Sequence, residues 1–404
     1  MRTPGDRHRA GPTPPSRRGR VVGAVGAVAL AVAACSSTPA APGPTASGPH
    51  DAVPATPGSH QDTAFAGDGP YKPGVVFETT PQGDVVVVTY PVDASSTAGK
   101  PTYVIDLLRW FTGSPTAPIP AGLPSTLPTT LATDAYTGVP ISARGPFPVV
   151  LFSHGYGGYP EQSSFLTDHL ATWGFVVVAP DHRSRDLRAV VSGTTGRGQN
   201  DITDLRDALA LVKRMNATPG TLFTGKLDLT RVASLGHSAG GGAAITVADD
   251  SDIRTYIGLA PSPGTPPPSK PGLIMQGTSD KVVIPSGTLK LYAKLKSPKR
   301  LVLIDGAGHN VFDDGCTIGV AQGGLVEFIK TLNLPPAFAS IATDGCSPPD
   351  ISPPTAWPLI DQVVTAQLRY GLGIDTTPVG LSGGLDHAFG GVTASVRDTV
   401  TAAS

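Results

Sequence analysis

Short apolar runs alternate with segments of helical periodicity over much of this chain. The apolar runs predict strands at Val75–Phe77, Val85–Val88, Pro148–Phe152, Gly174–Ala179, Val232–Leu235, Tyr256–Ala260, Leu273–Gln276 and Leu301–Ile304. The periodic segments predict helices at Glu161–Thr172, Asp201–Asn216, Ala239–Ala248, Gly323–Leu332 and Leu359–Gly371. Strands that are almost wholly apolar, separated by helices, indicate an α/β fold with a mostly parallel central sheet and helices on both faces. Ligand sites in such sheets lie beyond the C-terminal ends of the strands.

Residues 99–145 interrupt this alternation with a Pro- and Thr-rich stretch that also contains Trp110 and Phe111. The stretch is either a surface excursion or a flap near the site, and the pattern does not decide between them. We expect residues 71–404 to form a single domain, with an insertion near 99–145 and an extended C-terminal segment from about residue 335.

The N-terminus has the layout of an export signal. Residues 1–20 are rich in arginine with Asp6 as the single acid, and an apolar stretch follows from Val21 to Ala34. That stretch is shorter than the about 20 residues of a membrane-spanning helix, so residues 1–34 are predicted to be a signal peptide. Its end, Val32-Ala33-Ala34-Cys35, resembles a bacterial lipoprotein signal, which implies that Cys35 is lipidated and anchors the protein to the outer face of the membrane. The alternative is a cleaved secretory peptide with an incidental cysteine, and Arg17-Arg18 also hints at twin-arginine export.

The amino-acid composition narrows the classes of protein to which the chain can belong. The chain contains 49 Gly and 42 Pro in 404 residues, together roughly 22% against a usual share of about 12%. Residues 35–70 consist mainly of Pro, Ala, Gly, Ser and Thr, and they are predicted to be a disordered tether. With 30 basic and 31 acidic residues the net charge is −1, so no global field attracts nucleic acid. These values exclude a coiled coil, a polytopic membrane protein and a basic nucleic-acid binder, and they say nothing about oligomeric state.

The chain has three cysteines, an odd number for an exported protein. If Cys35 is acylated, Cys316 and Cys346 remain as one pair. Export makes a disulfide between them possible. The alternative is two free, buried thiols.

The candidate nucleophile is Ser238. Gly236-His237-Ser238-Ala239-Gly240 matches the G-x-S-x-G pattern, follows an apolar strand and precedes a helix of small residues. A nucleophile elbow needs this arrangement, because the turn is tight and the helix N-terminus offers N–H groups to developing negative charge. A second match, around Ser382, has no strand before it and no room for partner residues after it.

An acid and a histidine follow in the order that the elbow requires. Asp280 lies in the loop after the strand Leu273–Gln276, and His309 lies in the loop after the strand Leu301–Ile304. His309 is predicted to act as the general base, and Asp280 to hold the imidazole in the correct tautomer. Asp305 is the competing acid, and the competing histidines are His154, His182 and His387.

Ser153-His154-Gly155-Tyr156-Gly157-Gly158 follows an early strand and completes the predicted site. The backbone N–H groups of Tyr156 and Ala239 are the expected donors to a tetrahedral oxyanion. The alternative is a Gly-rich turn with no catalytic duty. Asp181-His182-Arg183 is interpreted as a loop network, and the sequence offers no convincing metal-ligand set or cofactor motif.

Four blocks in this order carry a resemblance: FSHGYGGYPEQSSFLTDHLATWGFVVVAPDHRSRD, RVASLGHSAGGGAA, GLIMQGTSDKVV and LVLIDGAGHN. Over roughly residues 70–335 the chain resembles the α/β-hydrolase superfamily, in the branch of platelet-activating-factor-acetylhydrolase-like, dienelactone-hydrolase-like and cutinase-like serine esterases. The resemblance implies the roles given above to Ser238, Asp280, His309, Tyr156 and Ala239. Cutinase-like polyesterases commonly place a Met after the nucleophile and a Trp after the sixth strand, where this chain has Ala239 and Ala260–Gly264.

The expected function is an exported serine hydrolase that cleaves short or medium acyl esters, lipids or phospholipids among them, without a cofactor. Its partners would be a small ester or lipid substrate and the membrane that holds the lipid anchor. A non-catalytic envelope binding protein on the same scaffold and an amide or peptide hydrolase with the same triad remain alternatives.

Overall fold

A computed structural model describes residues 61–113, 129–196, 200–318, 324–331, 336–381 and 385–398, all within one compact unit of residues 49–404. The predicted signal peptide, Cys35, most of the predicted tether and Ser382 lie outside the described residues. None of the described helices is long and apolar enough to cross a bilayer.

One sheet contains every strand of the described residues, in the order β11-β10-β9-β8-β7-β5-β6-β2-β1-β4-β3. The strands are β1 (Lys72–Thr79), β2 (Val85–Val92), β3 (Thr102–Asp106), β4 (Thr130–Thr137), β5 (Phe147–Ser153), β6 (Val176–Pro180), β7 (Leu227–His237), β8 (Ile253–Leu259), β9 (Gly272–Gly277), β10 (Lys299–Ile304) and β11 (Ala394–Asp398). From β10 to β6 each neighbouring pair is parallel. Antiparallel pairs occur towards the two edges, where β2 pairs with β6 and with β1, β3 with β4, and β11 with β10. The predicted mostly parallel sheet is therefore confirmed.

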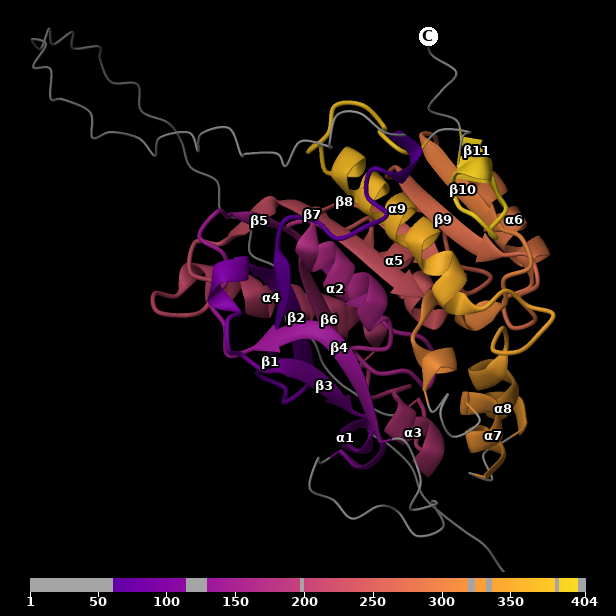
Figure 1. The fold of residues 1–404 in the computed structure, drawn as a ribbon, viewed down its shortest axis with the longest axis horizontal. Helices are drawn as coiled ribbons and strands as arrows, with labels where there is room; N and C mark the ends of the chain where they lie inside the picture. Colours follow the sequence, from indigo (N-terminus) through magenta and orange to yellow (C-terminus); the bar gives the residue numbers. More distant parts are fainter. Residues whose placement is uncertain are drawn as a thin grey trace, which may run out of the picture. The chain divides into compact units, whose positions relative to one another are not determined.

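Helices cover both faces of the sheet (Figure 1). The α-helices are α1 (Leu107–Thr112), α2 (Ser164–Thr172), α3 (Leu187–Ser192), α4 (Asp201–Ala217), α5 (Ala239–Val247), α6 (Pro285–Lys294), α7 (Gly324–Thr331), α8 (Pro336–Thr343), α9 (Pro353–Gly371) and α10 (Leu385–Ala388). Short 3-10 helices are η1 (Gln61–Thr63), η2 (Ala94–Ser96), η3 (His309–Phe312) and η4 (Gly315–Thr317).

Alternate residues of β5 separate two apolar cores. Val150 and Phe152 pack with α2 and α9, whereas Val149 and Leu151 pack with α4, α5 and α6. This alternation follows from the two-residue period of a strand. Because both sets of side chains are apolar, the strand is buried on both faces, as its unbroken apolar run predicted.

Two helix boundaries differ from the sequence prediction for local reasons. Helix α2 begins at Ser164, because the N–H groups of Ser164 and Phe165 donate to the carboxylate of Asp314, a cap from a distant part of the chain. Helix α9 begins at Pro353, earlier than predicted, because proline fits the first turn of a helix, where its missing N–H leaves no bond unmade.

Part of the stretch 99–145 belongs to the sheet. Strands β3 and β4 pair with each other, and β4 continues the sheet from β1. Helix α1 lies between them in sequence and is capped by Asp106, whose side chain accepts a hydrogen bond from the N–H of Leu108. This segment therefore extends the sheet edge and brings α1 towards the site.

Residues 61–70, at the end of the predicted tether, contact the folded part. Phe65 is fully buried, packs edge-to-face on Trp173, and its N–H donates to the side chain of Gln362. The N–H of Gly69 donates to the Thr172 hydroxyl. This segment is held in place by contacts with residues that are distant in the sequence. Local composition does not reveal such contacts.

Candidate active site

The turn between β7 and α5 places Ser238 at the C-terminal edge of the sheet. Ser238 has φ 58° and ψ −119°, a conformation that is rare for a residue with a side chain. A Cβ at Gly236 would lie 2.2 Å from the carbonyl oxygen of Gly240, and a Cβ at Gly240 would lie 2.0 Å from that of Ser153. Both flanking glycines are therefore required by close backbone approach.

Asp280 and His309 come from the loops after β9 and β10 and meet directly. Nδ1 of His309 lies 2.9 Å from Oδ2 of Asp280, and both side chains are almost fully buried. The second carboxylate oxygen, Oδ1, accepts from the N–H groups of Val282 and Val283, each at 2.8 Å. The amide of Gln276 donates to Oδ2 at 2.9 Å. Four hydrogen bonds thus hold the carboxylate, and the carboxylate orients the imidazole.

Ser238 and His309 line the same cavity, whose volume is about 830 Å³ when space open to solvent is included. Nε2 of His309 is buried and has no hydrogen-bond partner among the described residues. Because Nδ1 is held by Asp280, Nε2 is the nitrogen that is available for proton transfer.

The loop after β5 forms another wall of this cavity and contains Tyr156, which is 39% exposed. Among the described residues no acceptor is found for the backbone N–H of Tyr156 or of Ala239, the first residue of α5. The carbonyls of His154 and Gly155 both accept from Nη1 of Arg185. Arg185 therefore fixes the loop from its buried side, a role that sequence reasoning did not assign.

His237, the residue before Ser238, was also missed, although it lies within the elbow motif. Gln162 receives a hydrogen bond from the N–H of Gly155 at Oε1, and its Nε2 lies 2.9 Å from Nδ1 of His237. Nε2 of His237 lies 3.2 Å from the carbonyl oxygen of His309. Burial and the neighbouring His309 keep the pKa of His237 well below its usual value, so the ring is neutral. One tautomer of His237 satisfies both contacts and links the β5 loop to the His309 loop.

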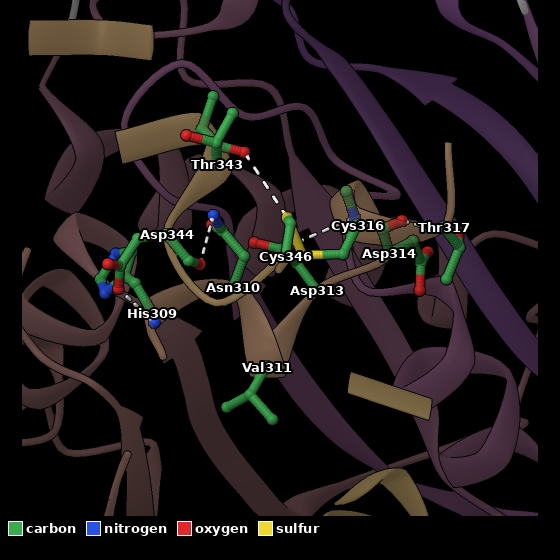
Figure 2. Close-up of a disulfide and its surroundings, with 12 residues drawn as sticks. His309, Asn310, Val311, Asp313, Asp314, Cys316, Thr317, Thr343, Asp344 and Cys346 are labelled. Atoms are coloured by element: carbon green, nitrogen blue, oxygen red, sulfur yellow. Dashed lines mark hydrogen bonds between the residues drawn. A yellow bond between two sulfur atoms is a disulfide. The ribbon is translucent and has the colours of Figure 1, made fainter. Parts of the chain in front are cut away.

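The segment after α8 forms a second support that sequence reasoning missed. Oδ2 of Asp344 accepts from the backbone N–H of His309 at 2.8 Å and from that of Lys281 at 3.2 Å. Two residues further on, Cys346 forms a disulfide with Cys316, which confirms the predicted pair. Figure 2 shows this disulfide beside Asn310 and Asp344. A carboxylate and a disulfide therefore tie this segment to the loops that carry Asp280 and His309.

The competing residues have other partners. Asp305 is exposed and accepts from the Thr278 hydroxyl. His154 is fully buried, with Nδ1 on the carbonyl of Gly155 and Nε2 accepting from the N–H of His182, and burial lowers its pKa. Nothing is described of the side chain of His387, which lies in α10.

His182, Asp201 and Asp204 lie close enough together to hold a metal ion. His182 nevertheless bonds the Ser153 hydroxyl and Asp204, each at 2.8 Å. The guanidinium of Arg185 donates to Asp201 at 2.6 Å. These contacts fit the loop network that the sequence predicted around His182, and the adjacent guanidinium opposes a cation.

Parts of this chain are similar to proteins named as hydrolases, cutinases and esterases. Residues 135–331 match the family described as PET hydrolase-like, and residues 60–207 match platelet-activating factor acetylhydrolase, isoform II. The chain is 26% identical to cutinase est2 of Thermobifida alba over 40% of this chain and 53% of the cutinase. It is 28% identical to the platelet-activating factor acetylhydrolase of Cavia porcellus over 30% of this chain and 36% of that enzyme. The matched region thus spans about half of the first relative and about a third of the second.

A solved structure resembles this chain in fold over a larger part of its length. The ferulic acid esterase from Streptomyces cinnamoneus superposes with a TM-score of 0.52 at 21% identity, covering 76% of this chain and 92% of that one.

Proposed function

Because the chain belongs to the α/β-hydrolase superfamily, we propose that it is an exported serine hydrolase that cleaves carboxylic esters through an acyl-enzyme at Ser238. Its substrates are short or medium acyl esters, with lipid esters among them. The observation that carries the proposal is the 2.9 Å contact between Asp280 and His309 beside the cavity that Ser238 lines. The names of the similar cutinase and acetylhydrolase agree with it.

In the first half-reaction the Ser238 hydroxyl attacks the ester carbonyl carbon and its proton passes to Nε2 of His309. Asp280 stabilises the imidazolium that forms. The carbonyl oxygen becomes an oxyanion, which accepts hydrogen bonds from the N–H groups of Tyr156 and Ala239. The intermediate collapses when the bond to the alcohol oxygen breaks, and the alcohol leaves with the proton from His309.

In the second half-reaction water attacks the acyl-serine and gives its proton to His309. The tetrahedral intermediate then collapses, Ser238 recovers its hydrogen, and the carboxylic acid is released. The rare backbone conformation of Ser238 and the two required glycines support this role, because they hold the serine at the sheet edge beside the helix N-terminus.

Ser238→Ala tests the reaction. The purified protein should release nitrophenol from 4-nitrophenyl butanoate, and the variant should lose about 10³-fold or more in kcat while remaining folded. The matched control is Ser251→Ala, which changes an exposed serine outside the cavity. Turnover at the wild-type rate in Ser238→Ala would refute the mechanism.

Fluorophosphonate labelling separates this proposal from a non-catalytic binding protein. We expect labelling of the wild type and of Ser251→Ala, and none of Ser238→Ala. A folded wild-type protein that is not labelled would favour the binding protein. Nitroanilide substrates with the same acyl groups test amide hydrolysis, and faster turnover of amides than of esters would favour an amidase.

The N-terminal sequence supports export and attachment of a lipid to Cys35. Incorporation of radiolabelled palmitate in a bacterial host tests the anchor, with Cys35→Ser as the variant. Release of unlabelled wild-type protein into the medium would show secretion without an anchor.

A further inference from the structure

One wall of the cavity comes from the chain after His309. We call it the C-terminal wall and define it by four apolar side chains, Ile318, Ile329, Phe338 and Ile341. Ile318, Ile329 and Phe338 are each less than one-tenth exposed, although they line a cavity that also contains Ser238 and His309. A group bound against this wall would therefore be largely removed from water.

Phe338 lies against the loop of the expected oxyanion donor. A Cβ at Gly157 would be 2.2 Å from Cε2 of Phe338, so the ring lies directly on that glycine. The ring of Tyr156 is 6.4 Å away between centroids, in an edge-to-face arrangement. An ester carbonyl bound at the N–H of Tyr156 would therefore have Phe338 close beside it.

Hydrogen bonds and a disulfide hold the C-terminal wall in a fixed position beside the site. The side-chain amide of Asn310, next to His309, donates to the carbonyls of Ile341 and Asp344 at 2.8 and 3.0 Å. The disulfide between Cys316 and Cys346 joins the two ends of this region (Figure 2). Helices α7 and α8 pack on each other and on η4. Helix α8 can therefore hold Phe338 at a defined distance from His309.

The lining of the cavity favours an uncharged guest. The described lining residues include no lysine or arginine, so an anionic group would find no cationic side chain there. Among the described lining residues Asp313 is the one acid, and burial raises its pKa well above its usual value. Gln162 and Asn310 also line the cavity, but both use their side chains to bond the protein itself.

We propose that the C-terminal wall binds the acyl group of the ester, a neutral alkyl chain, and that Phe338 sets the length of chain that is accepted. This inference rests on the proposed ester hydrolysis and assigns a substrate class to the same site. Phe338 and Ile341 lie beyond both stretches of the chain that match known families, which end at residues 207 and 331.

A ladder of 4-nitrophenyl esters from acetate to dodecanoate tests the proposal, with Phe338→Ala as the variant. Removing the ring makes room for extra methylenes, so the optimum should move to longer chains. The ratio of kcat/KM for decanoate to that for butanoate should rise about tenfold or more. The matched control is Phe389→Ala, which removes a half-buried ring outside the cavity and should leave the ratio unchanged.

Two further variants test the same proposal if Phe338→Ala does not fold. Phe338→Leu should move the optimum in the same direction by a smaller amount. Ile341→Phe adds volume to the C-terminal wall and should move the optimum to shorter chains. An unchanged ratio in all folded variants, or an equal loss for every ester, would overturn the proposal.

A binding measurement separates failure of this inference from failure of the proposed function. Calorimetry with uncharged N-methylalkanamides from butanamide to dodecanamide needs no turnover, and Ser238→Ala protein can be used. The acyl site would be supported, even in a protein without esterase activity, if affinity rises with chain length up to a maximum accepted length. That maximum length should be greater in Phe338→Ala. Affinity that does not depend on chain length would overturn it even in an active enzyme.

Discussion

The side-chain carboxylate of Asp344 accepts a hydrogen bond from the backbone N–H of His309, at 2.8 Å. The same oxygen accepts from the N–H of Lys281, the residue after Asp280, at 3.2 Å. Gly308 makes this approach possible, since a Cβ at Gly308 would lie 2.4 Å from the Cα of Gly345. One carboxylate therefore sets the position of the imidazole loop relative to the loop that carries its acid partner.

From this contact we expect Asp344 to be a positioning residue. Asp344→Ala should lower kcat by about 100-fold with little change in KM, because a displacement of about 1 Å at the reacting groups is enough for such a loss. Asp344→Asn keeps an acceptor oxygen and should recover most of the activity. Steady-state kinetics on a short ester measures both variants. If Asp344→Ala raised KM alone, or if Asp344→Asn were as impaired as Asp344→Ala, the positioning role would be wrong.

The close packing of the glycines beside Ser238 leads to a prediction about stability. Gly240→Ala would place a Cβ 2.0 Å from the carbonyl oxygen of Ser153, and backbone atoms have little freedom to move away. We expect the variant to be strongly destabilised or insoluble. Gly390→Ala is the matched control, because no atom lies within 4 Å of its added Cβ. Thermal unfolding followed by circular dichroism distinguishes the two, and equal melting temperatures would contradict the structure at this turn.

The disulfide should contribute to the free energy of unfolding. Its cysteines are 30 residues apart in sequence, and closing a loop of that length stabilises by about 3.6 kcal/mol in the chain-entropy description. A variant with Cys316→Ser and Cys346→Ser should therefore unfold at lower urea concentration, whereas Cys35→Ser should not. Coincident unfolding curves for the double variant and the wild type would show that the bond adds no stability.

Glu161 provides a prediction about pH. Its side chain is buried, with Tyr103 donating to Oε1 at 2.9 Å, and burial raises its pKa to about 8 from 4.5. Between these values the folded protein binds the proton more tightly than the unfolded chain does. The contribution of Glu161 to stability therefore falls as the pH rises from about 4.5 to about 8, and it is constant above.

Glu161→Gln removes this titration and keeps an acceptor for Tyr103. Its melting temperature relative to that of the wild type should increase between pH 5 and pH 8 by several degrees. Melting curves at pH 5, 6, 7, 8 and 9 test this expectation. A difference that stays constant across the series would mean that Glu161 does not titrate as its burial requires.

Strands β1, β2 and β5 to β10, helices α2, α4, α5, α7 and α9, and the candidate triad could be predicted from the sequence. Local patterns carry that information: an unbroken apolar run such as Val149–Phe152 indicates a strand buried on both faces, and G-x-S-x-G after such a run indicates an elbow. Asp280 and His309 follow from their places after later strands, because parallel strands end at the same edge of the sheet. If Cys35 is acylated, the number of cysteines leaves Cys316 and Cys346 as one possible pair, and the structure decides between a disulfide and two free thiols.

What only the tertiary structure decided is the part that depends on contacts between segments distant in the chain. Three such contacts are the cap of α2 by Asp314, the hydrogen bond from the His309 N–H to Asp344, and the packing of Phe338 on Gly157. No local sequence pattern predicts them, because each residue is ordinary among its own neighbours in the chain. Strands β3 and β4 are likewise ordered by the sheet edge that they join rather than by their own composition. The proposed reaction class therefore rests on local sequence patterns, whereas the shape of the cavity is set by side chains that meet only when the chain has folded.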